Sequence, residues 1–302
     1  MSDILINKNL EPLREFIDNL NYKEIIISKP YELNIETKTG EWLHFHNNKL
    51  SLQYLFGLSR LLAIKEGKVF NEDKSNLAAI IDNKHRVNVV YGKQTNHDIS
   101  VVIRLKRNSG FSLNDFSIPQ KDRERLIELV KLKKTILISG GTHTGKTTLL
   151  NSLIKYINPS ERIITIENVQ EIEINPEIHK THDALLYLED SGDKTAELLN
   201  SCLRMRPDRI IIGELRYENS YVFLRACNTG HEGTLSTIHA NNPQGALDAL
   251  VHNIKSSGKT LSHDEKRLRE ELAKNIDAVI QINREYVNKE MVVTGYLEEN
   301  LE

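Results

Sequence analysis

The segment Gly140-Gly141-Thr142-His143-Thr144-Gly145-Lys146-Thr147 decides the fold of this 302-residue chain. It matches the pattern G-x-x-x-x-G-K-[ST], in which the backbone N–H groups of a glycine-rich loop surround nucleotide phosphates. The apolar run TILIS (135–139) precedes the loop and a helical pattern over 146–157 follows it. That order of strand, loop and helix is the setting the motif requires, so the segment predicts a nucleotide-binding α/β domain.

The residues of the loop predict how it holds a nucleotide. Glycines allow the close turn, and the following helix directs the positive end of its dipole at the phosphates. Lys146 is expected to reach the β- and γ-phosphates and the Thr147 hydroxyl to ligate magnesium, which makes ATP and Mg²⁺ the expected cofactors. His143 is interpreted as a variable position. The residues expected to contact the nucleotide are Gly140, Gly141, Thr142, His143, Thr144, Gly145, Lys146, Thr147 and Thr148.

Downstream of the loop, apolar strands alternate with helices. Strands are expected at 162–167, 209–212 and 233–238, and a further helix at 121–132 leads into the loop strand. Such alternation, with nearly continuous apolar strands, is typical of a parallel sheet covered by helices on both faces.

The first hundred residues follow a different pattern, that of an α+β unit. The expected elements are helices at 10–20 and 50–66, a strand meander at 23–28, 31–37 and 41–46, and a hairpin of 85–91 with 98–105. Residues 107–120 are rich in Ser, Asn, Gly and Pro, which is typical of a linker. We therefore expect an N-terminal α+β domain over 1–106, a linker over 107–120 and a nucleotide-binding domain over 121–302.

Glutamates follow two of the expected strands. Glu214 comes after RIIIG (209–213), and Glu167 ends RIITIE (162–167). Because the carboxyl ends of parallel strands meet at one edge of a sheet, both carboxylates should lie beside the phosphate loop. A nucleotide hydrolase needs acids there to hold magnesium and orient water, so Glu214, Glu167 and Thr147 are the candidates for the metal site.

Other charged residues near these strands are more ambiguous. His239 follows the strand at 233–238 and could hydrogen-bond the γ-phosphate, or be a histidine of the core or surface. Arg86 and Arg104 lie on the expected hairpin, either as edge charges or as groups that neutralise the γ-phosphate. Glu171 and Glu173 are expected on a solvated stretch. Of Arg204, Arg206, Arg209 and Arg216, one or two could meet phosphate and the others are expected to pair with surface carboxylates.

The composition excludes several classes of protein. The net charge is -2, from 40 basic and 42 acidic residues, which does not indicate a strongly basic nucleic-acid binder. Cys202 and Cys227 form no CxxC pair, and sparse cysteine fits a reducing cytosol. The first ten residues lack the pattern of a signal peptide, and no apolar stretch approaches the roughly 18 residues of a membrane span. We expect a cytoplasmic protein with at most peripheral membrane contact.

Four motifs along the chain carry a family resemblance. They are GGTHTGKT (140–147), TIENVQEI (165–172), SCLRMRPDRIIIGELR (201–216) and GHEGTLSTIHA (230–240). In this order they resemble the Walker A motif, Asp box, Walker B motif and His box of the P-loop ATPases that drive type II and type IV secretion, pilus motors and conjugation. The third motif is most similar to the type IV secretion branch. The tetracysteine zinc element usual in the type II and pilus-assembly branch has no counterpart after Cys227.

The resemblance implies a two-domain subunit with a RecA-like P-loop ATPase domain behind a smaller α+β domain, and ATP held between them. It implies a homohexameric ring on the cytoplasmic face of the bacterial inner membrane. The ring would power assembly of, or translocation through, a type IV secretion system. Its expected partners are other secretion-system ATPases and inner-membrane channel components, without sequence-specific nucleic-acid binding.

Roles carry over by position in the motifs. Glu214 would activate the attacking water, Glu167 would help hold magnesium or water, and His239 would sense the γ-phosphate. Arg86 and Arg104 would reach the phosphates from the first domain. The Asp box commonly reads T-I-E-D, and this chain has Asn168 at the fourth position, which leaves more of the acidic role to Glu167.

Three alternatives share parts of this pattern. A pilus assembly or retraction ATPase, or a type II secretion ATPase, has the same chemistry with other partners. A RecA-like nucleic-acid translocase would show nucleic-acid-stimulated hydrolysis with strong salt dependence. A non-hydrolysing nucleotide switch is disfavoured by the set Lys146, Thr147 and Glu214. Neither the transported substrate nor the ring size follows from the sequence.

Overall fold

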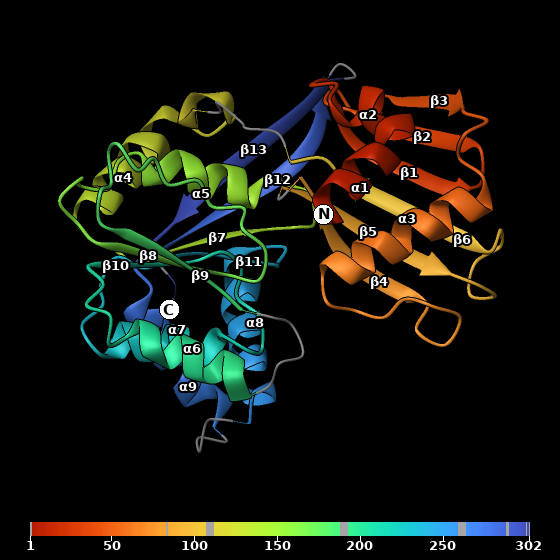
Figure 1. Cartoon of the computed structure of the whole chain (residues 1–302). Helices are drawn as coiled ribbons and strands as arrows, with labels where there is room; N and C mark the ends of the chain where they lie inside the picture. Colours follow the sequence, from red (N-terminus) through yellow and green to blue (C-terminus); the bar gives the residue numbers. More distant parts are fainter. Residues whose placement is uncertain are drawn as a thin grey trace. The chain divides into compact units, whose positions relative to one another are not determined.

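The computed structural model describes residues 2–82, 84–106, 112–187, 193–258, 264–287, 290–299 and 301. The chain divides into two compact units, Met1–Asn108 and Ser109–Glu302, each with its own sheet (Figure 1). Residues 107–111 of the expected linker lie outside the described residues. Within the described part, no helix is long and apolar enough to cross a membrane.

The first unit is an antiparallel sheet with helices packed on one face (Figure 1). Its strand order is β3-β2-β1-β6-β5-β4. The described strands are β1 (Tyr22–Lys29), β2 (Glu32–Thr37), β3 (Trp42–His46), β4 (Asn76–Ile81), β5 (His85–Tyr91) and β6 (Ile99–Arg104), and the helices are α1 (Ser2–Asn9), α2 (Glu11–Ile17) and α3 (Leu52–Lys65). The meander and the hairpin predicted from the sequence are present; β4 was not predicted, because its Ala78 and Ala79 carry little strand propensity.

Alternation along each strand explains why only one face of this sheet is covered. Ile25 and Ile27 of β1 and Ile103 of β6 are buried in the core that the sheet shares with the helices. The residues between them point the other way, since successive side chains of a strand face opposite sides. Glu24 and Arg104 are register partners on that second face.

The second unit is built on a mostly parallel sheet of order β13-β12-β7-β11-β10-β8-β9. Its strands are β7 (Ile136–Gly140), β8 (Ile163–Glu167), β9 (His182–Leu186), β10 (Arg209–Ile212), β11 (Leu235–Ile238), β12 (Ala278–Val287) and β13 (Glu290–Glu298). Only β13 runs antiparallel to its neighbour among the pairings described. The parallel sheet predicted for this domain is therefore confirmed; β9, β12 and β13 were not predicted.

Helices cover both faces of this sheet, as the continuous apolar strands required. The described helices are α4 (Gln120–Lys131), α5 (Lys146–Ile154), α6 (Asp193–Cys202), α7 (Ser220–Asn228), α8 (Pro243–Ser256) and α9 (Glu265–Asn275). In Figure 1, α4 and α5 lie on one face and α6 to α9 on the other. Neighbouring residues of β7 enter the two cores in turn: Ile136 and Ile138 face α4 and α5, and Leu137 faces the opposite helices.

The described end of the expected linker belongs to the second unit. A short 3-10 helix, η1 (Leu113–Asp115), is closed by a capping box in which Ser112 and Asp115 bond each other's backbone. Phe116 and Ile118 are buried in the core around α4 and α5, together with Leu113. The Ser- and Asn-rich composition suggested a free linker, but these apolar side chains anchor the segment.

A buried ion pair fastens the amino end of β10. Arg209 is 0% exposed, and its Nε donates to Glu161 Oε2 at 2.5 Å. Its Nη1 donates to the Gly233 carbonyl at 3.0 Å, and its Nη2 donates to the carbonyl of Val130. Gly233 has φ 80°, and a Cβ there would collide with the guanidinium, so a glycine is required. Arg209 therefore has a buried carboxylate partner, not the surface partner expected for these arginines.

Replacing Arg209 tests this pairing. Arg209→Met keeps most of the buried volume but leaves Glu161 as a buried charge without its main partner, so we expect a loss of about 3–5 kcal/mol in unfolding free energy. Urea unfolding followed by far-UV circular dichroism measures it. Arg204→Met, at an exposed arginine nearby, should change stability by less than about 0.5 kcal/mol. Equal effects of the two substitutions would contradict the assignment.

Candidate active site

The strand order places the predicted residues side by side at one edge of the sheet. β7 pairs with β11, β11 with β10 and β10 with β8, all in parallel. The phosphate loop follows β7, His239 follows β11, Glu214 follows β10, and Glu167 ends β8. The carboxyl ends of these four strands thus present their residues in a row, at the edge where open α/β sheets bind ligands.

The phosphate loop has the tight backbone that its glycines predict. Gly145 has φ 93° directly before α5, and His143 also lies in the left-handed region with φ 61°. A Cβ at Gly140 would come within 2.6 Å of the Ile282 carbonyl and 2.7 Å of Thr144 Oγ1. No side chain fits there, so the backbone itself forms the floor of the loop. His143 and Thr142 are exposed on the loop.

Lys146 is buried and bonded to the loop's own carbonyls. Its Nζ donates to the Gly140 carbonyl at 3.0 Å and to the Gly141 carbonyl at 2.7 Å, and it lies 3.1 Å from His239 Nδ1. A phosphate oxygen entering the loop would offer the ammonium a charge-assisted bond, which is stronger than a bond to a neutral carbonyl. The lysine is thus already located where a phosphate would be received.

His239 links Lys146 to Glu214. A lysine ammonium has only donors, so His239 Nδ1 must accept from it. The proton of the neutral ring then sits on Nε2, which donates to Glu214 Oε1 at 2.7 Å. The three side chains form one continuous hydrogen-bonded chain from the phosphate loop to the acid at the end of β10. This contact selects the site interpretation of His239 over that of an unrelated core or surface histidine.

Glu214 is held as an ionised carboxylate. Arg216 Nε donates to its Oε2 at 2.9 Å, opposite the bond from His239. Burial alone would raise the pKa of Glu214, but the hydrogen bonds from His239 and Arg216 and the positive charge of Arg216 outweigh it and lower the pKa to about 2. The group can therefore accept a hydrogen bond from water at any physiological pH.

Glu167 and Glu171 make different contacts at the end of β8. Glu167 is 3% exposed, and its Oε1 accepts from the backbone N–H of Glu171 and of Ile172, both at 2.9 Å. Thr147 Oγ1 donates to Glu171 Oε2 at 3.2 Å. The expectation that Glu171 lies on a solvated stretch is therefore wrong, because the turn fixed by Glu167 brings its carboxylate to the phosphate-loop helix. The spacing of two glutamates in ENVQE (167–171) is the signal that could have indicated this.

Asn168 has a local structural contact. Its Oδ1 accepts from the N–H of Val169 at 2.9 Å, which stabilises the turn after β8. Thr148 lies on α5 and is partly buried.

Arg86 and Arg104 lie in the first unit and face each other. They are register partners on β5 and β6, and Glu24 is the partner of Arg104 on β1. Burial raises the pKa of Glu24, the charge of Glu36 adds to this, and the charge of Arg104 opposes it. Two like charges directly opposite on neighbouring strands are unfavourable, and the carboxyl group of Glu24 beside Arg104 offsets part of that cost.

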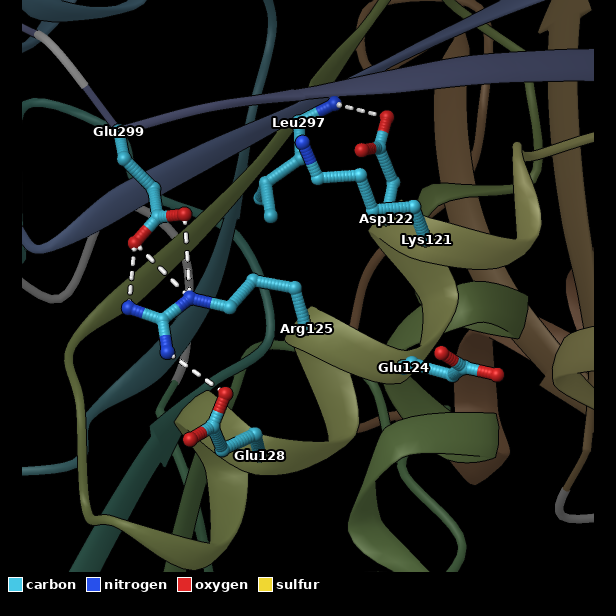
Figure 2. Close-up of a pocket in the computed structure, with 7 residues that line it drawn as sticks. All are labelled: Lys121, Asp122, Glu124, Arg125, Glu128, Leu297 and Glu299. Carbon is cyan, nitrogen blue, oxygen red and sulfur yellow. Dashed lines mark hydrogen bonds and ion pairs between the residues drawn. The ribbon is translucent and has the colours of Figure 1, made fainter.

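A separate hollow of about 510 Å³ lies between α4 and β13 (Figure 2). Its lining residues are Lys121, Asp122, Glu124, Arg125, Glu128, Leu297 and Glu299. Figure 2 shows Arg125 bonded to Glu299 and to Glu128, at 2.8 Å and 2.7 Å. None of the lining residues belongs to the phosphate loop or to the acidic strand ends, so the hollow is not part of the candidate site.

The donor set beside the phosphate loop fits magnesium. The Thr147 hydroxyl and the Glu171 carboxylate are in contact, and both offer oxygen, the donor that Mg²⁺ prefers. Within the described residues, no three His, Cys, Asp or Glu side chains are grouped as a protein-only metal cage.

Comparison with known proteins identifies the family. The family model for "Type II/IV secretion system protein" matches residues 72–289. The type IV secretion system protein VirB11 of Bartonella quintana is 30% identical over 324 residues, covering 93% of this chain and 89% of the relative. PtlH of Bordetella pertussis, also a type IV secretion system protein, is 30% identical over 276 residues, covering 82% and 80%. The chain therefore belongs to the type II/IV secretion system protein family.

A solved structure supports the same fold. The pilus retraction motor PilT with bound ADP superposes with a TM-score of 0.65 at 20% identity, covering 95% of this chain and 82% of that one. The predicted fold, a RecA-like P-loop domain preceded in the chain by a smaller α+β domain, is confirmed. Family membership likewise confirms the predicted class, a secretion-system ATPase.

The contacts of Glu214 predict a pH-dependent stability. Its pKa in the folded protein lies below 4.5, the ordinary value of a glutamate, so its contribution to stability is present above about pH 4.5 and is lost as the pH falls towards 2. At neutral pH, Glu214→Gln should melt below the wild type, and the gap should narrow as the pH is lowered. Differential scanning fluorimetry across this range checks it. The matched control is Glu177→Gln on an exposed turn, which should show no such narrowing.

Proposed function

We propose that this chain is the ATP-hydrolysing subunit of a homohexameric ring in a type IV secretion system. The ring acts at the cytoplasmic face of the bacterial inner membrane and powers assembly of the system or translocation through it. The observation that carries the proposal is the hydrogen-bonded chain Lys146–His239–Glu214, because it connects a phosphate-binding group to a carboxylate able to orient water.

The residues of the site supply three contributions to hydrolysis. Backbone N–H groups of the loop and Lys146 bind the phosphates and draw their charge towards the protein. Glu214 accepts a hydrogen bond from the attacking water and orients it. It can take the water's proton as the water oxygen bonds to the γ-phosphorus and the bond from that phosphorus to the oxygen of the leaving ADP breaks. His239 contacts both groups, so loss of the γ-phosphate is sensed by the same side chain that holds Glu214.

Magnesium is assigned to the side of the loop that carries Thr147. The Thr147 hydroxyl and Glu171 would hold it, with Glu214 facing it through water, and the ion would neutralise phosphate charge. The carboxylate of Glu167 stabilises the turn that carries Glu171, and we propose that it supports the magnesium site in this way. The family resemblance implies a more direct role, in which Glu167 helps to hold magnesium or water.

We assign Arg86 and Arg104 to the phosphates as well. The assignment follows the family resemblance, in which arginines at these positions of the first domain reach the phosphates. Such a contact would couple the nucleotide state to the first unit, as a motor requires.

The partners follow from the relatives. Relatives named as type IV secretion system proteins favour that system over the pilus motor, which is the second candidate because PilT shares the fold. The partners would be other ATPases and inner-membrane channel components of the secretion system. Binding assays against components of each system separate the two candidates.

Hydrolysis and mass measured together test the central proposal. The wild type should hydrolyse ATP as a hexamer by light scattering. Lys146→Ala should lose nucleotide binding and activity, and Glu214→Gln should bind ATP but lose at least about 100-fold in turnover, since one catalytic carboxylate is worth about that much. A wild type that remains a monomer and does not hydrolyse ATP at any concentration would overturn the proposal.

The arginine assignment has its own test. Arg104→Ala should bind ATP through the loop and lose about 10-fold or more in turnover, because an arginine on the transferred phosphate is worth that much or more. Arg60→Ala, at an exposed position on α3 of the same unit, serves as the control and should retain activity. If Arg104→Ala turns over ATP at the wild-type rate, the assignment of Arg104 to the phosphates is contradicted.

A further inference from the structure

Asn219 holds the backbone that carries Glu214. It is 0% exposed, its Nδ2 donates to the Glu214 carbonyl at 2.7 Å, and its Oδ1 accepts from the Arg216 N–H at 2.9 Å. The amide thus bridges the carbonyl of one residue and the N–H two residues further on. A carbonyl only accepts and an N–H only donates, so these partners fix which way the amide points.

The position of Asn219 makes this use of its side chain unusual. Asn219 is the N-cap of α7, where an asparagine ordinarily accepts from an N–H of the first helical turn. Its side chain makes no such capping bond here. The amide is instead committed to the loop before the helix, with Tyr187 Oη 3.3 Å from its Nδ2. Helix formation therefore does not explain why an asparagine is at this position.

Asn151 forms the same bridge beside Glu171. Located on α5, it donates from Nδ2 to the Glu171 carbonyl at 3.1 Å and accepts at Oδ1 from the Glu173 N–H at 3.0 Å. Again the carbonyl belongs to an acidic residue of the site and the N–H lies two residues further along. Asn151 thereby ties the Glu171 segment to the helix that carries Thr147.

The remaining contacts show what each bridge controls. Between Glu214 and Arg216, the Leu215 N–H donates to the Thr237 carbonyl at 2.8 Å, which attaches the loop to β11 at its middle. The described bonds to the Glu214 carbonyl and the Arg216 N–H come from Asn219. Without that amide the loop keeps the bonds of Leu215 to Thr237 and Asn253 and the bonds of the Arg216 carbonyl to Ser220. The bonds from Asn219 to the Glu214 carbonyl and from the Arg216 N–H to Asn219 are lost, so the backbone that carries the Glu214 carboxylate is held less firmly.

We propose that Asn219 and Asn151 are positioning residues for the ATPase reaction, each an amide bridge that directs a site carboxylate. Asn219 directs Glu214 towards His239, and Asn151 directs Glu171 towards Thr147. The inference rests on the proposed function for its kinetic consequences. Because a displacement of about 1 Å in a reacting group costs on the order of 100-fold in rate, small rotations of these loops are sufficient to matter.

Aspartate is the informative replacement because it has nearly the same shape. At position 219 it would keep the acceptor for the Arg216 N–H, lose the donor to the Glu214 carbonyl and place a second negative charge beside Glu214. Alanine removes both bonds. The control is Asn158→Ala: Asn158 accepts from the Ser160 N–H at 3.0 Å in an exposed turn outside the site.

The experiment combines turnover, nucleotide binding and hydrogen exchange on the full chain. Asn219→Ala and Asn219→Asp should lower kcat about 10- to 100-fold with KM for ATP changed less than about 3-fold. Asn151→Ala should raise the magnesium concentration for half-maximal turnover about 10-fold and leave ATP binding in EDTA unchanged. Amide exchange should become faster at Arg216 in the two Asn219 variants and at Glu173 in Asn151→Ala. The control Asn158→Ala should change none of these values.

A double-mutant cycle separates positioning from general destabilisation. If Asn219 acts through Glu214, adding Asn219→Ala to Glu214→Gln lowers the residual rate less than about 3-fold, because the group being positioned is already gone. An equal loss in both backgrounds, or a loss no greater than that of Asn158→Ala, overturns the proposal. Should Asn219→Ala fail to fold, Asn219→Asp decides. If the wild type does not hydrolyse ATP, the proposed function is contradicted. If amide exchange at Arg216 and Glu173 is the same in the asparagine variants as in the wild type, the proposed amide bridges are contradicted.

Discussion

The parallel pairing of β11 between β7 and β10 is the constraint on which the site depends. Neighbouring strands lie about 4.8 Å apart, so the residues at their carboxyl ends are set at regular steps along the sheet edge. β11 occupies the step between the phosphate loop and the acid of β10. His239 is therefore within reach of Lys146 on one side and Glu214 on the other, and no flexible segment is needed to bring them together.

The charged groups of the site hold one another in place. Lys146 is bonded to loop carbonyls and His239, and Glu214 is bonded to His239 and Arg216. A phosphate therefore exchanges partners with these groups and does not have to create their positions. Such preorganisation reduces the reorganisation required during reaction.

The sequence predicted the parts of the site that are local in the chain. The phosphate loop and the glutamate after β10 have short motifs with a physical basis, and the parallel sheet followed from the alternation of helices and strands. Glu171 was misassigned because its contact with Thr147 exists only after the turn beyond β8 closes onto α5. The amides of Asn151 and Asn219 have no sequence pattern at all, since their bonds go to backbone groups. The burial of Leu113 was not predicted, because it lies in a polar segment whose composition is typical of a linker.

The ion pair of Arg209 has a consequence for strand register. β10 consists of Arg209 and three isoleucines, all buried, and it is covered on both faces, so its apolar pattern does not distinguish one alignment with β8 and β11 from the next. A slip by one residue would move Glu214 by about 3.3 Å along the strand direction and turn its side chain to the opposite face of the sheet, beyond the reach of His239. The ion pair opposes that slip, because the Arg209 guanidinium would move away from Glu161 and leave a buried carboxylate without its main partner. The ion pair at the amino end of β10 thus sets the position of the proposed catalytic carboxylate at its other end.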